Sequence, residues 1–180
     1  MTGFAVVLYF DSATESRVKT LWESLYKEGV NPTLLTIGPR PHISLAVFES
    51  VDPAAIREEL RTIAEDFSPL TVELSSVGTF AASEGVVFVA PVVTMDLIEL
   101  HERFHRHLAE LEIPSDERYK PGNWVPHCTA AIDVTDEQLP AAIEICRSSD
   151  VFVAGQLTEI GLVECEPVHE LYSFPMGSDN

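Results

Sequence analysis

The sequence predicts an α+β fold of two similar lobes, each an antiparallel sheet with helices outside it, facing one another across a central cleft. The first observation is a motif that occurs twice, at residues 41–47 (PHISLAV) and 126–132 (PHCTAAI), with its two histidines 85 positions apart. The second is the alternation of apolar, strand-like runs with segments of helical periodicity. Each lobe should therefore carry one copy of the motif.

A third observation extends the repeat beyond the motif. PAAI at 53–56 returns at 140–143, and LSSVG at 74–78 returns as LTEIG at 157–161, in the same order relative to the histidines. Three matches in one order indicate an internal duplication. No linker rich in Gly, Ser or Pro separates the halves, so residues 1–180 are expected to form one bilobal unit. Its lobes are expected at about 1–80 and about 85–180, and strands exchanged between them are compatible with this pattern.

The elements of the first half follow from local signals. Residues 4–10 are continuously apolar and predict a buried strand, after which Asp11 and Ser12 cap a helix that Gly29 ends. Asp52 and Pro53 begin a second helix in the same way. The predicted β segments of this half are 33–37, 42–48 and 70–78. The first predicted strand of the second half is 85–92.

The second half is expected to continue in a similar order. The predicted elements are a helix at about 95–112, the second motif strand at 127–133, a helix at about 136–147, and strands at 151–163 and 168–174.

The chemistry follows from the spacing within each motif. Side chains at i and i+2 of a strand point to the same face, about 7 Å apart. His42 and Ser44 therefore share a face, as do His127 and Thr129, while Ile43 and the equivalent Cys128 point into a core. Two such strands facing each other would surround a small anion with two hydroxyls and two imidazoles that can move protons near pH 7.

The paired His-x-Ser/Thr motifs, in a duplicated α+β chain of this length, resemble the two-histidine phosphoesterase superfamily. That superfamily includes the 2′-5′ RNA ligases and the cyclic nucleotide phosphodiesterases. The resemblance implies a phosphoesterase that uses neither metal nor another cofactor and acts on a 2′,3′-cyclic phosphate or a 2′-5′ linkage of a small nucleotide or RNA end. It also implies that His42 and His127 form the acid/base pair and that Ser44 and Thr129 bind the phosphate.

Basic and aromatic residues precede each motif. Tyr119, Lys120 and Trp124 lie upstream of the second histidine, and Arg40 lies upstream of the first. Aromatic faces stack on nucleobases and a cation attracts phosphate, so these four are candidate substrate-binding residues. The alternative is that Trp124 fills the lobe interface and the cations are solvated.

Two other functions stay open. Residues 101–105 read HERFH and fit the H-E-x-x-H zinc-protease pattern on a predicted helix. A helical wheel, however, places His101 on the apolar stripe with His105 at its margin and Glu102 on the polar side, which favours packing over metal binding. A protein that binds nucleotides or RNA ends as a sensor, with weak activity, is the other alternative.

Composition restricts the partners. Eleven basic against 29 acidic residues give a net charge of −18, which would repel long nucleic acid. No apolar run is long enough to span a membrane, and no export signal is evident at the N-terminus. Three widely spaced cysteines suggest no disulfide framework. We therefore expect a cytoplasmic monomer with a small substrate and no membrane partner.

Overall fold

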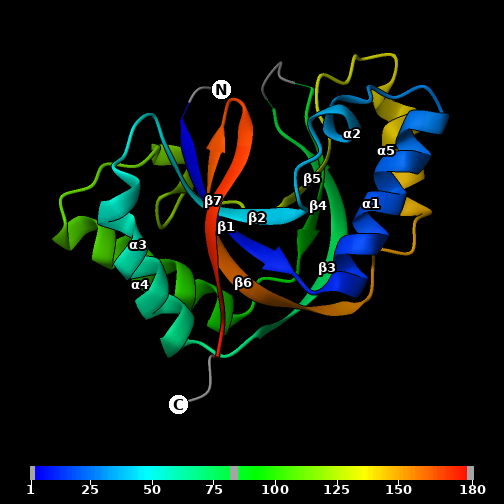
Figure 1. Cartoon of the computed structure of the whole chain (residues 1–180). Helices are drawn as coiled ribbons and strands as arrows, with labels where there is room; N and C mark the ends of the chain where they lie inside the picture. The colour runs from blue at the N-terminus through cyan, green and yellow to red at the C-terminus, as the bar shows by residue number, and fades with distance from the viewer. Residues whose placement is uncertain (1–2, 82–84, 178–180) are drawn as a thin grey trace.

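The structure is a computed structural model that describes residues 3–81 and 85–177 (Figure 1). It confirms the α+β class. The described strands pair antiparallel throughout, along a path β2-β1-β6-β3-β4-β5 with β7 added beside β6. The strands are β1 (Phe4–Phe10), β2 (His42–Phe48), β3 (Leu70–Thr79), β4 (Val87–Pro91), β5 (Cys128–Ala131), β6 (Ala154–Cys165) and β7 (Val168–Pro175).

Two pairs of helices flank the strands on opposite sides (Figure 1). Helices α1 (Ser12–Lys27) and α5 (Leu139–Arg147) pack together against β3, β4 and β5. On the other side, α3 (Pro53–Asp66) packs against β6 and β7 and contacts α4 (Met95–Glu110), which lies beside β2. The predicted caps are present, because the Asp11 carboxylate accepts the backbone N–H groups of Ala13 and Thr14, and Asp52 accepts that of Ala54. In the described part of the chain, no helix has the length and apolar character needed to cross a membrane.

The prediction of a β segment at 33–37 is wrong. These residues form a short helix, α2 (Thr33–Ile37), which follows Pro32 and ends at Gly38 in the left-handed conformation with φ of 69°. None of its residues is fully buried. A five-residue apolar run has no period that separates helix from strand, so the flanking Pro and Gly decided the outcome. The second motif strand is also shorter than predicted, at Cys128–Ala131.

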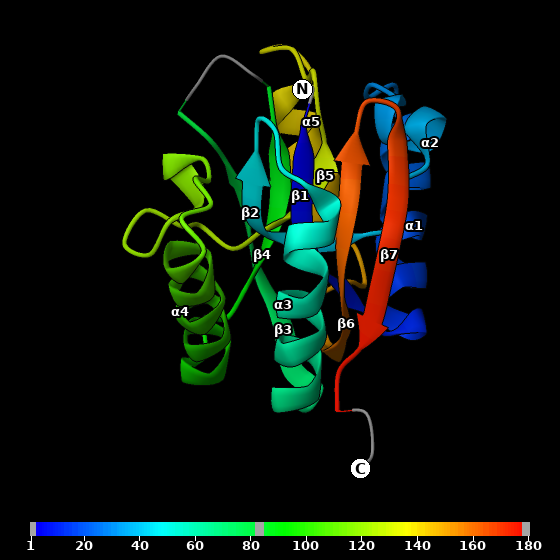
Figure 2. The same ribbon diagram turned by 60° about the vertical axis from the view of Figure 1, so that its left-hand side comes forward.

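Strand β3 joins two sheets. Its first residues pair with β6, as Leu70 does with Leu157, and its later residues pair with β4, as Val77 does with Val89. One sheet therefore contains β1, β2, β6 and β7, and the other contains β3, β4 and β5. Figure 2 shows β6 and β7 as adjacent antiparallel arrows beside α3. Each sheet combines strands from both halves of the chain. The division into two duplicated lobes stays a prediction, and residues 1–2 and 178–180 of those lobes lie outside the described residues.

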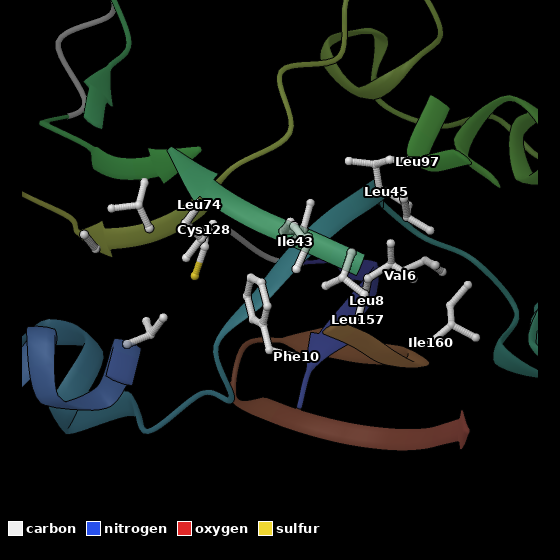
Figure 3. Close-up of a cluster of buried hydrophobic side chains, with 14 of the residues drawn as sticks. Val6, Leu8, Phe10, Ile43, Leu45, Leu74, Leu97, Cys128, Leu157 and Ile160 are labelled. Carbon is white, nitrogen blue, oxygen red and sulfur yellow. The ribbon is translucent and has the colours of Figure 1, made fainter. Parts of the chain in front are cut away.

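The core lies where the two sheets meet. Val6, Leu8 and Phe10 of β1 gather with Ile43 of β2 and Cys128 of β5 (Figure 3). Ile43 and Cys128 are 0% and 1% exposed, which confirms that the central residue of each motif points inward. The residues before and after each of them along the strand point to the opposite face of the sheet.

Candidate active site

The two motif strands are the end strands of the path, and their free edges lie against each other. Strand β2 pairs on one side with β1, and β5 pairs on one side with β4. Between their other edges, the backbone N–H of His42 donates to Cys128 Sγ. The sheets thus curve until the first and last strands of the path meet, which brings together two motifs that are far apart in the sequence.

Each motif strand carries a bulge immediately after its hydroxyl residue. Pairing with β1 passes from Val7–Ser44 to Val6–Ala46 and skips Leu45. Pairing with β4 passes from Phe88–Thr129 to Val87–Ala131 and skips Ala130. A bulge adds twist and redirects side chains, and it is common beside active sites. The two strands therefore share a local distortion at equivalent positions.

A matched pair of indoles holds the two strands. Trp124 Nε1 donates to the Ser44 carbonyl oxygen at 2.9 Å, and Trp22 Nε1 donates to the Thr129 carbonyl oxygen at 3.1 Å. Each bond satisfies the carbonyl of the hydroxyl residue of one motif, immediately before the bulge. The first indole comes from the loop before β5 and the second from α1, so each links its strand to a distant part of the fold.

The two histidines have the same tautomer. His42 Nδ1 lies 2.7 Å from the Arg40 carbonyl oxygen, and His127 Nδ1 lies 2.7 Å from the Val125 carbonyl oxygen. A carbonyl can accept but not donate, so Nδ1 carries the proton in each ring. The lone pair of each neutral ring is consequently on Nε2, the nitrogen available to accept a proton from a substrate.

Both rings favour the neutral form. Burial lowers the pKa of His127 below its usual value, and burial together with the positive charge of His127 lowers the pKa of His42. The surroundings account for this. The His127 ring lies 5.0 Å from the ring of Phe80 and 5.1 Å from that of Phe88, and the His42 ring lies 6.4 Å from Tyr9. A positive charge on His127 thus disfavours protonation of His42.

Two pockets flank the histidines. A pocket of about 550 Å³ contains His127 and Thr129 and has the aromatic walls Tyr119 and Trp124. A smaller one of about 320 Å³ contains His42 and Arg40. Ile132 lines both, so the two hollows adjoin. A group bound between the histidines could therefore extend to either side.

The structure separates the predicted site residues into two groups. His42, His127 and Thr129 line these pockets, as do Arg40, Tyr119 and Trp124. Ser44 is half-buried and lies in neither lining, although it shares the face of His42. Lys120 forms an ion pair with Glu117 and lies in a different hollow. The roles assigned to all of them remain predictions.

Sequence reasoning missed several residues of the site. Tyr9, Phe80, Phe88 and Ile132 line or enclose the pockets, but in the sequence they look like ordinary apolar strand residues. Trp22 is 5% exposed on the buried face of α1, and nothing near it in the sequence indicates its bond to the Thr129 carbonyl oxygen. Only the pairing of distant strands identifies these positions.

The H-E-x-x-H residues are used in packing. His101 Nε2 lies 2.8 Å from the Tyr119 carbonyl oxygen, and His105 Nε2 lies 3.0 Å from that of Leu45, so both Nε2 atoms act as donors. Glu102 is exposed. The His101 ring stacks on Trp124 with centroids 3.9 Å apart and planes 2° apart. These histidines therefore support the pocket wall and the bulge of β2, which disfavours the metalloprotease alternative.

Comparison with known proteins identifies the family. The sequence profile of the 2′-5′ RNA ligase superfamily matches residues 11–166, most of the chain. The chain belongs to the 2′-5′ RNA ligase superfamily. This confirms the resemblance to two-histidine phosphoesterases that the paired motifs indicated.

Individual relatives and solved structures are also similar to this chain. A protein of Bacillus cytotoxicus provisionally named a phosphoesterase is 29% identical over 146 residues, which are 77% of this chain and 81% of that protein. Escherichia coli LigT in complex with 3′-AMP has a similar fold, with a TM-score of 0.57 at 12% identity over 97% of both chains. TT0787 of Thermus thermophilus gives a TM-score of 0.60 at 12% identity, covering 99% of this chain and 100% of that one. At these identities the structural comparisons support the fold alone.

Proposed function

We propose that this protein is a metal-independent phosphoesterase that opens the 2′,3′-cyclic phosphate of a small nucleotide or RNA end. His42 and His127 act as its acid/base pair. The observation that carries the proposal is the matched arrangement of these two residues. They lie on adjoining strand edges, each with Nδ1 donated to a backbone carbonyl and Nε2 left for the substrate. Relatives described as phosphoesterases support phosphoester chemistry, and the similarly folded LigT, whose structure contains 3′-AMP, motivates the choice of a nucleotide substrate.

The reaction needs two proton transfers. One histidine, neutral at Nε2, accepts a proton from water as the water oxygen forms a bond to phosphorus. The bond from phosphorus to one ribose oxygen breaks, and that oxygen takes a proton from Nε2–H of the other, protonated histidine. The product is an acyclic nucleoside monophosphate with one new hydroxyl. Because the two rings have the same tautomer, the geometry permits either to act as the base.

The hydroxyl residues stabilise the charge that develops on phosphate. Thr129 lines the pocket with His127, and Ser44 occupies the equivalent position after His42. Their O–H groups would donate hydrogen bonds to the non-bridging oxygens, whose charge grows in the transition state. The neutral resting state of both histidines also suits this substrate, because an arriving phosphate anion favours protonation of one ring of the pair.

The test is a panel of phosphate esters with identified products. The panel contains 2′,3′-cyclic nucleotides, a 2′-5′-linked dinucleotide and a non-nucleotide diester, each incubated with EDTA-treated protein and followed by chromatography and ³¹P NMR. We expect the cyclic phosphate to become a monophosphate, and we expect His127→Ala to lose this activity. The control is His169→Ala, which removes an exposed histidine of β7.

Three outcomes would contradict the proposal. Binding of nucleotides without any turnover would indicate the sensor function instead. Activity lost with EDTA and restored by zinc would show that a metal takes part. Full activity in a folded His127→Ala variant would remove the acid/base pair.

A further inference from the structure

The pocket beside His42 differs in character from its larger neighbour. Its walls are mainly apolar and come from β1, β6, β7 and the turn after α2, with contributions from Val7, Ile37, Val163 and Val168. Its polar groups besides His42 are Tyr9, Arg40 and Glu170. Apart from the histidine, Arg40 is the sole basic side chain among its described lining residues.

The charge of Arg40 is already neutralised. Its Nη2 lies 2.9 Å from Glu159, its Nε lies 3.4 Å from Glu15, and its Nη1 lies 3.4 Å from Glu170. The guanidinium also covers the Tyr9 ring at 4.0 Å from the centroid. Donor groups aimed at three carboxylates are not free to receive a phosphate, because phosphate would have to displace a bound carboxylate.

Glu170 is held in place at this pocket. Its carboxylate accepts hydrogen bonds from Arg40, from the Ser173 hydroxyl at 3.3 Å and from the Tyr9 hydroxyl. Lys19 adds one positive charge to the cluster through Glu15, at 2.6 Å. Two cations and three carboxylates sum to −1, so an anion entering here meets repulsion instead of a counter-ion.

The larger pocket is suited to the other end of a nucleoside. Trp124, Tyr119 and Phe80 give it flat aromatic walls beside His127. An aromatic base fits such walls by stacking. Because Ile132 lines both pockets, a nucleoside whose base stacks there and whose phosphate lies between the histidines can place its 5′ group in the pocket that contains Glu170.

From this arrangement we infer that the pocket beside His42 is a second substrate subsite, which accepts an uncharged, carbon- or hydroxyl-bearing group and excludes a second phosphate. The inference rests on the proposed function, since it takes the reacting phosphate to lie between the histidines. The preferred substrate then carries its reacting phosphate as its one charged group near the site. A 5′-hydroxyl nucleoside 2′,3′-cyclic phosphate meets this condition, and a substrate with a 5′-phosphate or pyrophosphate does not.

The test compares two substrates that differ by one phosphate. Adenosine 2′,3′-cyclic phosphate and its 5′-phosphorylated form are assayed for kcat/KM at low and high salt. The wild type should prefer the 5′-hydroxyl form by about tenfold or more in kcat/KM, because the net negative charge of the cluster repels the dianionic 5′-phosphate. The preference should shrink as salt screens the cluster.

Variants show whether the cluster causes the preference. Glu170→Gln removes one negative charge and keeps an acceptor for Arg40, so the preference should fall several-fold. The control is Glu144→Gln on α5, an exposed residue paired with Arg147, which removes the same charge elsewhere and should leave the preference unchanged. Equal use of both substrates by the wild type overturns the inference, as does a preference that Glu170→Gln leaves intact.

A binding measurement separates this inference from the proposed function. Calorimetry compares 3′-AMP with adenosine 3′,5′-bisphosphate on wild type and Glu170→Gln. If no cyclic phosphate is turned over, but the wild type binds 3′-AMP more tightly than the bisphosphate and Glu170→Gln narrows this difference, the subsite stands and the proposed reaction is wrong. If the bisphosphate binds as well as 3′-AMP, the subsite is wrong whatever the reaction. If neither ligand binds, both are wrong.

Discussion

Replacement of His101 by glutamine should change how stability depends on pH. The His101 side chain is 2% exposed, and its burial, together with the nearby charge of His105, lowers its pKa to about 4. The unfolded chain has an ordinary histidine with a pKa near 6.5. Below pH 6.5 the unfolded state therefore binds more protons than the folded state, so stability falls as the pH decreases toward about 4.

The magnitude follows from these two values. The difference between 6.5 and about 4 corresponds to at most ~3.4 kcal/mol. Relaxation of the folded protein around a charged ring reduces the expectation to about 2 kcal/mol. The glutamine variant does not titrate, so it should lose about that much less stability than wild type between pH 7 and pH 4. At pH 7 it should be the less stable protein by roughly 1 kcal/mol, because the stack on Trp124 is lost.

The assay is urea unfolding at several pH values, followed by circular dichroism. His169→Gln, which removes an exposed histidine of β7, serves as the control and should follow the wild-type curve. An acid loss as large in His101→Gln as in the wild type would refute the reasoning. A KM increase in the same variant at pH 7 would further show that the stacked ring positions the pocket wall.

Three predictions concern the reaction itself. His42→Ala and His127→Ala should each lower kcat by a factor of about 10² or more, with a double variant far from additive, as single-turnover assays will show. Ser44→Ala and Thr129→Ala should each lower kcat/KM by the equivalent of ~1.5–3 kcal/mol, the range for a hydrogen bond to a charged group. A decrease in kcat/KM of less than about twofold would contradict the proposed contact with phosphate. The pH profile of kcat/KM should be bell-shaped and centred below 6.5, because burial lowers the pKa of both histidines, and each single histidine variant should lose one limb. A maximum above neutral pH would contradict the assignment.

Much of the framework was predictable because its signals are local. The caps at Asp11 and Asp52, and the inward residues Ile43 and Cys128, follow from neighbouring residues and a fixed period. The paired motifs carried more information than either alone, since duplicated strands are expected to occupy equivalent places. Together they indicate the superfamily that the family match confirms.

The remaining features depend on contacts between distant residues. Nothing near Arg40 indicates that Glu159 and Glu170, more than a hundred positions away, will surround its guanidinium. The bond from Trp22 to Thr129 joins residues 107 positions apart, and the stack of His101 on Trp124 joins a helix to a separate loop. The misassigned segment at 33–37 is a different case, because its local signals were present but too short to distinguish helix from strand.

The position of β1 between β2 and β6 has a consequence for folding during synthesis. Val6 pairs with Ala46 on one side and with Leu162 on the other, and the second partner is synthesised much later than the first. Until then, an almost wholly apolar strand has one edge without its partner, a condition that favours association with other chains. The long sequence separation also predicts slow folding. The pairing of β1 with β6 can form only after β6 has been synthesised, so the sheet that carries His42 is completed late.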